Sequence, residues 1–294
     1  MGGEGDTVKA GTFHYERPAS MVEALAVKRK WGDAGRFLAG GQSLIPAVNL
    51  RLNASSCLID LNRVEELRGI RRSDNHVVIG AMATHAEVME SALIAETLPI
   101  LREAGTHLAH TAIRNRGTFG GSLALADPAA EWPAACLLLD AEIRIIGDQG
   151  SWSCPTSDFL QGLYTTRLGE NDLLESVAIP IPAANERYAV IELARRRGDF
   201  AVAAVLARGQ VVGARLEKLA IVLFGVSDRP LRLAAVESTA EAMANSGQSE
   251  GISDAVRDLL ASVHIVADLT HSVQAKRHLC GVLVRRAVHQ LLSA

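Results

Sequence analysis

Two glycine-rich segments, each placed after a short apolar stretch or a helical stretch, constrain this chain more than any other feature. The first, Ala39 to Ser43 (AGGQS), follows Phe37 and Leu38, and the second runs from Asn115 to Ser122 (NRGTFGGS). Adjacent glycines carry no Cβ, so their backbone N–H groups can turn toward an anion, and nearby hydroxyl groups add donors. We expect two flexible phosphate-binding loops, the second being the stronger signal. For the first, an ordinary tight turn is the alternative.

The chain lacks the two commonest nucleotide-binding patterns. Neither segment has the GxGxxG spacing of a Rossmann fold, and no P-loop (GxxxxGK followed by Ser or Thr) occurs. We therefore expect two loops from different domains to hold one diphosphate from both sides. Asp127 and Glu131 follow the second loop, and a carboxylate beside a dinucleotide typically accepts hydrogen bonds from its hydroxyl groups. The alternative for this pair is a helix cap at Asp127 and a surface carboxylate at Glu131.

Charge and hydropathy exclude several classes of function. The 294 residues carry a formal net charge of -3, and the longest basic run is Arg195 to Arg197, so we expect no nucleic-acid partner. That run is interpreted as the solvated end of a strand. No apolar run reaches the roughly 18 residues that a membrane span needs. Residues 1–9 lack the apolar core of a secretory signal, so we expect the protein in the cytoplasm.

The cysteines form no recognisable metal-binding or redox set. They lie too far apart for any CxxC pair, so neither a zinc ribbon nor a locally ligated iron–sulfur cluster is predicted. No metal ligand and no catalytic side chain are predicted elsewhere. We expect structural thiols at Cys57, Cys136, Cys154 and Cys280.

Apolar periodicity and turn residues divide the chain into three predicted domains, 1–61, 62–182 and 183–294. Ser20 with Glu23 forms one predicted capping box, and Thr84 with Glu87 forms another. Strands are expected at 37–39, 57–61, 77–81, 141–146, 173–181, 188–194, 202–207 and 216–224. Helices are expected at 18–31, 97–109, 132–139, 231–245 and 272–292, and a helix or helical turn is expected at 43–52. The last third is therefore predicted to be a small antiparallel sheet covered by helices.

Several motifs, in order along nearly the whole chain, resemble one known family. They are AGGQSLIP at 39–46, RNRGTFGGSLALADPAAEWP at 114–133, YTTRLGENDLLESVAIP at 164–180, RRRGDFAVAAV at 195–205 and RHLCGVLVRRA at 277–287. Together they are similar to the FAD subunit of molybdenum hydroxylases, the relatives of xanthine dehydrogenase and carbon monoxide dehydrogenase. The resemblance implies an α+β fold with a two-part, PCMH-like FAD-binding region and a C-terminal antiparallel sheet covered by helices.

The resemblance also implies which residues contact FAD. Glu131 would contact the ribityl chain, although the family more often has Asp there, which leaves Asp127 as a competing contact. Phe200 and Leu168 would lie beside the flavin ring, with a core Phe on a strand as the alternative for Phe200. Lys276 stands where relatives often have Tyr and is expected to be structural. The two diphosphate cradles would be formed by Ala39, Gly40, Gly41, Gln42, Ser43 and Leu44 and by Thr118, Phe119, Gly120, Gly121 and Ser122.

Histidines near the second domain's helices are further candidates, because a histidine beside a flavin can tune its potential or exchange protons. A core or surface role is the more common alternative for such residues. These candidates are His85, His107 and His110.

The family's function follows from the same resemblance. It implies an electron-transfer subunit that accepts electrons from 2Fe–2S clusters of a small partner subunit and passes them to an external acceptor. A large partner subunit would carry molybdopterin, and the particle would be a dimer of heterotrimers. One alternative is a stand-alone FAD-dependent NAD(P)H reductase. A second is a nucleotide-binding interaction module that holds only ADP-like ligands.

Overall fold

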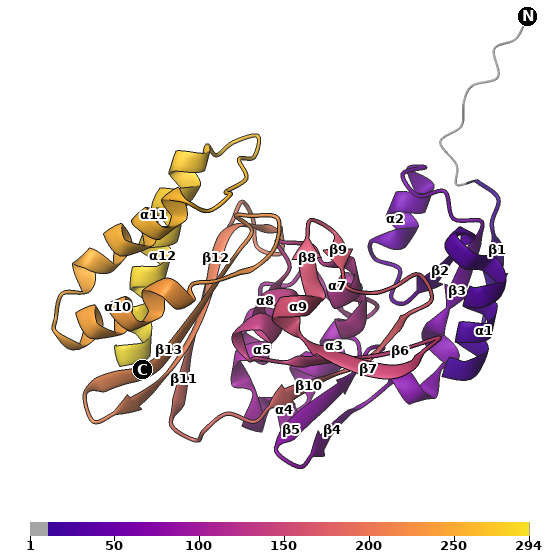
Figure 1. Ribbon diagram of the computed structural model, residues 1–294, viewed down its shortest axis with the longest axis horizontal. Coiled ribbons are helices and arrows are strands. Elements are labelled where there is room, and N and C mark those ends of the chain that lie inside the picture. The colour runs from indigo at the N-terminus through magenta and orange to yellow at the C-terminus, as the bar shows by residue number, and fades with distance from the viewer. Residues whose placement is uncertain (1–10, 294) are drawn as a thin grey trace, which may run out of the picture.

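The computed structural model describes residues 11–293, which form three units, each built on its own main sheet (Figure 1). The three units follow one another along the long axis, from the indigo N-terminal unit to the yellow C-terminal helices. The predicted α+β class is therefore confirmed. The domain bounds 1–61, 62–182 and 183–294 stay a prediction. Residues 1–10 lie outside the described part, and they include residues 1–9, on which the cytoplasmic prediction rests.

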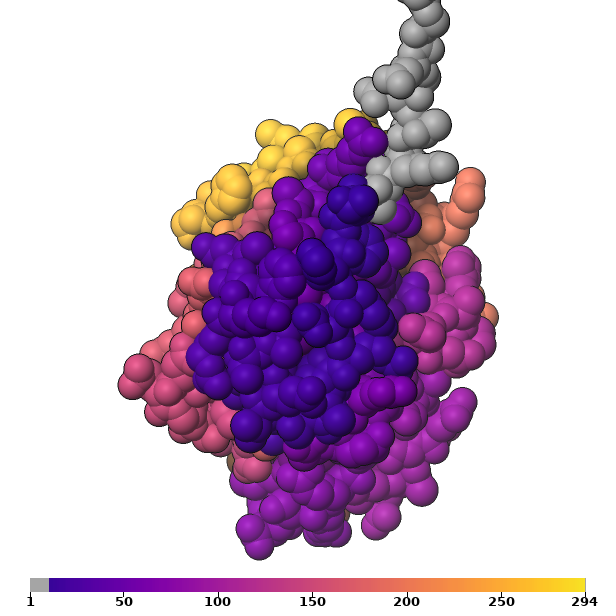
Figure 2. Space-filling view, turned by 90° about the vertical axis from the view of Figure 1, so that its right-hand side faces the viewer, coloured from indigo at the N-terminus to yellow at the C-terminus, as the bar shows by residue number. Residues whose placement is uncertain are grey.

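The first unit is a small parallel sheet with strand order β1-β3-β2. Parallel neighbours require crossover connections, which the helices α1 and α2 provide. Ser20 caps α1 by accepting a hydrogen bond from the N–H of Glu23 at 3.2 Å. Figure 2 shows this unit forming one end of the molecule. Its elements are β1 (His14–Glu16), α1 (Met21–Trp31), η1 (Gly32–Ala34), β2 (Gly35–Leu38), α2 (Leu44–Asn49), β3 (Cys57–Asp60), η2 (Leu61–Arg63) and η3 (Glu65–Leu67).

The second unit is a five-stranded antiparallel sheet, in the order β4-β5-β10-β6-β7, with helices packed against it. Its core joins strand residues such as Ile79 and Ile143 to Phe119 and Trp132 from the helices. The strands are β4 (Ile70–Ser73), β5 (His76–Gly80), β6 (Glu142–Gly147), β7 (Gly150–Pro155) and β10 (Leu173–Pro180), with a separate hairpin of β8 (Leu160–Gly162) and β9 (Thr165–Thr166). The helices are α3 (His85–Glu90), α4 (Ala92–Thr97), α5 (Pro99–Gly105), α6 (Thr111–Arg114), α7 (Phe119–Leu125), α8 (Glu131–Leu138) and α9 (Thr156–Phe159).

The third unit is an antiparallel sheet, β11-β12-β13-β14, buried on both faces. Side chains alternate between the faces of a strand. Val205 and Ile221 accordingly pack in the core with the C-terminal helices, whereas Ala204 and Val222 pack in the core of the second unit. The elements are β11 (Glu186–Ala194), β12 (Ala201–Val212), β13 (Arg215–Phe224), β14 (Leu231–Arg232), α10 (Ala234–Asn245), η4 (Ser249–Gly251), α11 (Ile252–Ala261) and α12 (Val273–Ser293).

Three sequence predictions about elements are wrong. The predicted helix 97–109 is shorter, because Thr97 still ends α4, α5 starts at Pro99 and ends at Gly105, and Ala109 has a φ of +36°. The predicted helix 231–245 begins only at Ala234, because residues 231–232 pair with β13. The second glycine-rich segment is not a flexible loop throughout, since it becomes helical at Phe119.

Other local predictions are confirmed in detail. Thr84 and Glu87 form a complete capping box, whereas the carboxylate of Glu23 accepts from the N–H of Ala19 rather than of Ser20. Arg195 to Arg197 are exposed just beyond the end of β11. Lys276 is buried, and its ammonium group donates to the carbonyl of Gly225 at 3.1 Å, as expected of a structural residue.

Candidate functional site

The two glycine-rich segments, far apart in sequence, meet backbone to backbone. A Cβ placed on Gly40 would lie 2.1 Å from the carbonyl oxygen of Arg116 and 2.6 Å from the Cα of Gly117. These distances are shorter than any van der Waals contact, and the neighbouring atoms are main chain that cannot swing away. Only glycine permits this approach. The first unit and the second therefore contact each other at these two loops.

The first loop presents backbone donors that the protein does not use. It turns through Gly41, whose φ is +76°, a conformation that glycine adopts without strain. Among the hydrogen bonds between residues 11–293, none uses the backbone N–H groups of residues 40–44. Gln42 and Ser43 are also exposed. This loop therefore offers a set of free amides to a ligand, as an anion-binding nest requires.

The second loop differs, because most of its amides already have partners. The N–H groups of Phe119 and Gly120 donate to the carbonyls of Ala83 and Ala81 at 2.8 and 2.9 Å. The N–H of Gly121 donates to the hydroxyl of Thr118, which caps α7, at 3.0 Å. These bonds fix the loop against β5 and α3. The donors left for a ligand are the backbone N–H of Thr118 and side-chain hydroxyls, among them that of the half-buried Ser122.

A buried pair of side chains supports the second loop from below. The indole N–H of Trp132 donates to Nδ1 of His85 at 2.8 Å, and the Nε2 edge of His85 lies against Gly117. Burial, and secondarily the charge of Arg114, lowers the pKa of His85 to about 4, so this histidine is neutral near pH 7. Of the three candidate histidines, His85 is the one whose ring lies against Gly117 of the second glycine-rich segment.

The two acidic candidates lie in different environments. Asp127 accepts from the N–H of Ala129 at 2.9 Å and from the hydroxyl of Tyr164 at 3.3 Å. Glu131 is buried at the start of α8, so its alternative as a surface carboxylate is wrong. Burial, and then the charges of Glu192 and Asp127, raises the pKa of Glu131 to about 8. The Glu131 carboxyl is thus neutral near pH 7 and can donate as well as accept hydrogen bonds.

Leu168 and Phe200 are placed differently from each other. Leu168 is half-buried against the second unit's core, and Phe200 is 68% exposed just before β12, so its alternative as a core residue is wrong. The residue after Phe200, Ala201, lies against Gly225, whose N–H donates to the carbonyl of Pro128 at 2.8 Å. The turn carrying Phe200 therefore lies close to the segment that carries Asp127.

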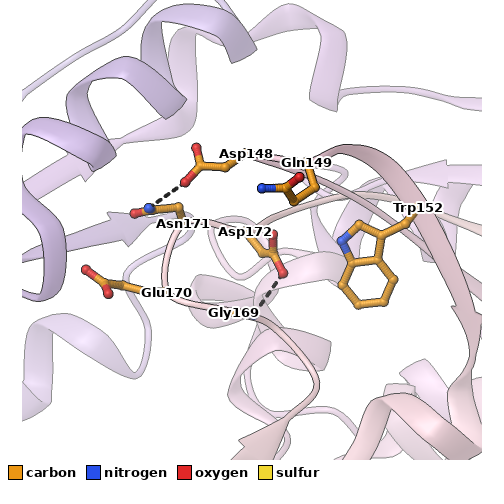
Figure 3. A pocket seen from close by; sticks show the side chains of 7 residues that line it. All are labelled: Asp148, Gln149, Trp152, Gly169, Glu170, Asn171 and Asp172. Carbon is orange, nitrogen blue, oxygen red and sulfur yellow. Dashed lines mark hydrogen bonds between the residues drawn. The ribbon is translucent and has the colours of Figure 1, made fainter.

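A separate hollow of about 350 Å³ lies where the β6–β7 turn faces residues 169–172 (Figure 3). Asp148 there is bonded to Arg29 at 3.0 Å and to Asn171 at 2.7 Å. Three carboxylates line the hollow, so it repels a diphosphate and does not compete with the glycine-rich loops. Its lining residues are Asp148, Gln149, Trp152, Gly169, Glu170, Asn171 and Asp172.

Comparison with known families decides what these loops belong to. Residues 11–182 match the model of the FAD binding domain in molybdopterin dehydrogenase. The chain belongs to this family of FAD-binding subunits. Residues 188–291 match the CO dehydrogenase flavoprotein C-terminal domain, so the family covers nearly all of the described chain. FAD is therefore the cofactor of this flavoprotein, and the resemblance stated from the motifs is confirmed.

Individual relatives agree over almost the full length. The carbon monoxide dehydrogenase medium chain of Afipia carboxidovorans is 34% identical over 280 residues, 95% of this chain and 96% of that one. The caffeine dehydrogenase subunit beta of a Pseudomonas species is 35% identical over 236 residues, 78% of each chain. The solved carbon monoxide dehydrogenase of Hydrogenophaga pseudoflava that lacks the Mo-pyranopterin moiety superposes with a TM-score of 0.91 at 33% identity, covering 97% of this flavoprotein and 98% of that chain. The flavoprotein is thus one subunit of a larger oxidoreductase.

The donor set of the first loop suits the diphosphate of FAD, since free backbone N–H groups are the usual partners of phosphate oxygens.

The described residues hold no cluster of three or more side chains able to bind a metal ion. No helix within residues 11–293 is long and apolar enough to cross a membrane. The four cysteines are buried and free.

Sequence reasoning missed the residues that hold the first loop in place. The side-chain amide of Asn62 donates to the carbonyl of Ala39 at 3.2 Å and to Asp60 at 2.6 Å. Asp60 is the last residue of β3, which lies beside β2, and Asn62 follows two positions later. Polar residues at the carboxyl end of a predicted parallel strand were the signal that would have drawn attention to them.

Proposed function

We propose that this flavoprotein is the electron-transfer subunit of a molybdenum-containing hydroxylase or dehydrogenase. In this role it takes electrons from 2Fe–2S clusters of a small partner subunit and passes them to an external acceptor. The observation that carries the proposal is the set of free N–H groups at residues 40–44, next to the second glycine-rich segment. Bound there, FAD supplies the redox chemistry that the chain's own side chains lack.

The residues of this chain bind and orient the cofactor in the proposal. The backbone amides of Gly40 to Leu44, in the segment that begins at Ala39, hold the diphosphate. The hydroxyls of Thr118 and Ser122 add side-chain donors. The positions of Phe119, Gly120 and Gly121 then act by fixing the second loop, because their amides are already bonded.

The acidic and apolar residues act at the other end of the cofactor in this proposal. The carboxyl group of Glu131, or that of the competing Asp127, accepts hydrogen bonds from the ribityl hydroxyls. Leu168 and Phe200 lie against the flavin ring, where the exposed face of Phe200 supplies apolar contact area.

The assembly is proposed from the relatives, which are named as medium chains or as subunits of larger enzymes. A large molybdopterin-bearing subunit and a small iron–sulfur subunit would complete the particle, arranged as a dimer of heterotrimers in the cytoplasm. The three predicted domains would then serve FAD binding (1–61 and 62–182) and the fixing of the C-terminal sheet against them (183–294).

The test is to purify the flavoprotein from its native host under conditions that preserve complexes. We expect three copurifying polypeptides, molybdenum and iron in the preparation, and visible bands of flavin and iron–sulfur clusters. Substrate-dependent bleaching of the flavin band would show that electrons reach this subunit. A colourless single chain that does not take up added FAD would contradict the proposal.

A second measurement, on the isolated flavoprotein and the whole particle, separates the proposal from a stand-alone NAD(P)H reductase. The isolated flavoprotein, reconstituted with FAD, is mixed with NADH or NADPH and an artificial acceptor. Sustained turnover by the single chain at the rate of the whole particle would favour the reductase.

A further inference from the structure

We propose that Asn62 is a positioning residue that aims the Gly40 N–H group away from Asn62 and toward the ligand of the first loop. The inference rests on the proposed FAD contact at residues 40–44. It adds a residue that touches no cofactor itself and that lies outside both glycine-rich segments.

The contacts of Asn62 place it directly behind the loop. Its side-chain amide donates to the carbonyl oxygen of Ala39 at 3.2 Å, across 23 positions of sequence. Its own backbone is held on both sides, because its N–H donates to Asp60 at 2.8 Å and its carbonyl accepts from the guanidinium of Arg68 at 2.9 Å. Asn62 is therefore a fixed donor rather than a mobile surface side chain.

The geometry of the peptide bond turns this contact into control of an amide. A trans peptide group is planar, and its C=O and N–H point in opposite directions. No cis peptide occurs among the described residues. When Asn62 holds the carbonyl of Ala39, the N–H of Gly40 in the same peptide group must point away from Asn62. That N–H has no partner among residues 11–293, so it is left free for the ligand.

A buried carboxylate anchors Asn62 in turn. Asp60 is 5% exposed and accepts from the side chains of Tyr15 and Asn62, while Arg17 lies 3.4 Å from its second oxygen. Burial acts to raise the pKa of Asp60, but the hydrogen bonds from Tyr15 and Asn62 and the charge of Arg17 outweigh it and lower the pKa. The carboxylate stays ionised and keeps one amide hydrogen of Asn62 engaged, which directs the other toward Ala39.

This anchoring joins the ends of all three parallel strands. Tyr15 is on β1, Asp60 ends β3, and Ala39 follows β2. The carboxyl ends of parallel strands lie at one edge of the sheet, where ligands of open α/β sheets are bound. Asn62 thus connects the sheet edge to the loop that is proposed to hold the diphosphate.

The experiment compares Asn62→Ala and Asn62→Asp with the wild type in the whole purified enzyme. Release of FAD after dilution is followed by the rise of flavin fluorescence, and the unfolding temperature is recorded on the same samples. Loss of one hydrogen bond that orders a ligand-binding group predicts about tenfold faster release for Asn62→Ala. Asn62→Asp keeps the shape of the side chain but cannot donate when ionised, and we expect still faster release at pH 8.

A pH series gives the readout that a merely structural role would not produce. As the pH falls and the carboxylate introduced by Asn62→Asp takes up a proton, its repulsion of the Ala39 carbonyl oxygen ends, while its single hydrogen goes to the nearby Asp60 carboxylate. Its release rate, divided by that of the wild type at each pH, should therefore fall toward that of Asn62→Ala. Asn75→Ala, an exposed asparagine in the β4–β5 turn, is the matched control and should release FAD at the wild-type rate.

The outcomes separate this inference from the proposed function. Wild-type rates and a flat pH series for both Asn62 variants, in an enzyme that holds FAD, would overturn the role of Asn62 alone. A lower unfolding temperature without faster release would overturn it as well, since Asn62 would then serve only the fold. A wild-type enzyme without FAD would overturn the proposed function itself.

Discussion

Gly40 and Arg116, which belong to different structural units, are in main-chain contact. A Cβ on Gly40 would sit 2.1 Å from the Arg116 carbonyl oxygen, so the first loop can reach the second only as a glycine. Two units with separate sheets therefore meet at the loop whose amides have no partner among residues 11–293. The contact makes the loops one site rather than two independent turns.

Gly40→Ala should separate the two loops. Forcing a methyl group into main-chain atoms costs about 1–3 kcal/mol, and we expect a loss of unfolding free energy in that range together with loss of bound FAD. Urea unfolding and the ratio of flavin to protein absorbance measure the two effects. Gly11→Ala is the control, because nothing lies within 4 Å of a Cβ at that position; equal flavin content in both variants would count against the contact.

Gly121→Val should release FAD for a reason that the sequence alone did not give. The added Cβ does not enter free space for a phosphate, because it would lie 2.7 Å from the Thr118 hydroxyl and 3.4 Å from the Ala39 Cβ. The valine would displace the cap of α7 and push the first loop away, so FAD content should fall at least about tenfold.

Thr118→Ala tests the cap without added bulk. It should lower the unfolding free energy by about 1 kcal/mol while retaining more FAD than Gly121→Val. Equal loss of FAD in both variants would contradict the larger effect expected from displacement of the first loop.

Glu131→Gln should change how stability depends on pH. The pKa of Glu131 is raised from 4.5 to about 8 in the folded chain. Between these values the folded state binds more protons than the unfolded state, so the free energy of unfolding falls as pH rises, by up to about 1.4 kcal/mol per pH unit. Glutamine does not titrate, so the variant should lose less stability between pH 5 and pH 8 in urea unfolding. Parallel curves for variant and wild type would contradict the buried position of the Glu131 carboxyl.

His85→Phe should weaken the support under the second loop. Phenylalanine fills the space but leaves the buried indole N–H of Trp132 without the acceptor it has 2.8 Å away, which costs about 1–3 kcal/mol. Thermal unfolding should detect the loss. His85 has a pKa lowered from 6.5 to about 4, so the wild type should lose stability as pH falls through this window, and the variant should lose less.

Local sequence patterns were enough to predict the glycine-rich loops, because two adjacent glycines after a strand, Gly40 and Gly41, allow a turn that depends only on neighbouring residues. They were also enough for the capping box of Thr84 and Glu87 and for the antiparallel sheet of the last third, but not for the face of that sheet that packs on the second unit. Motif resemblance over the whole chain supplied the family and the cofactor, which local patterns left open.

Contacts between distant residues were not predictable in this way. The amides of Phe119 and Gly120 are occupied by carbonyls of Ala83 and Ala81, which no spacing within the second segment reveals. The helix α8, which begins at Glu131, packs against β12 and β13 of the third unit, so an acidic residue before a helix was equally compatible with a surface position. The partner of Ala39, Asn62, belongs to a different element and carries no motif.

The most direct test is a crystal structure of the purified enzyme with FAD bound. We expect diphosphate oxygens within about 2.7–3.2 Å of backbone nitrogens of Gly40 to Leu44, with the Ala39 carbonyl still bonded to Asn62. A diphosphate bound elsewhere, with those amides facing solvent, would contradict the account.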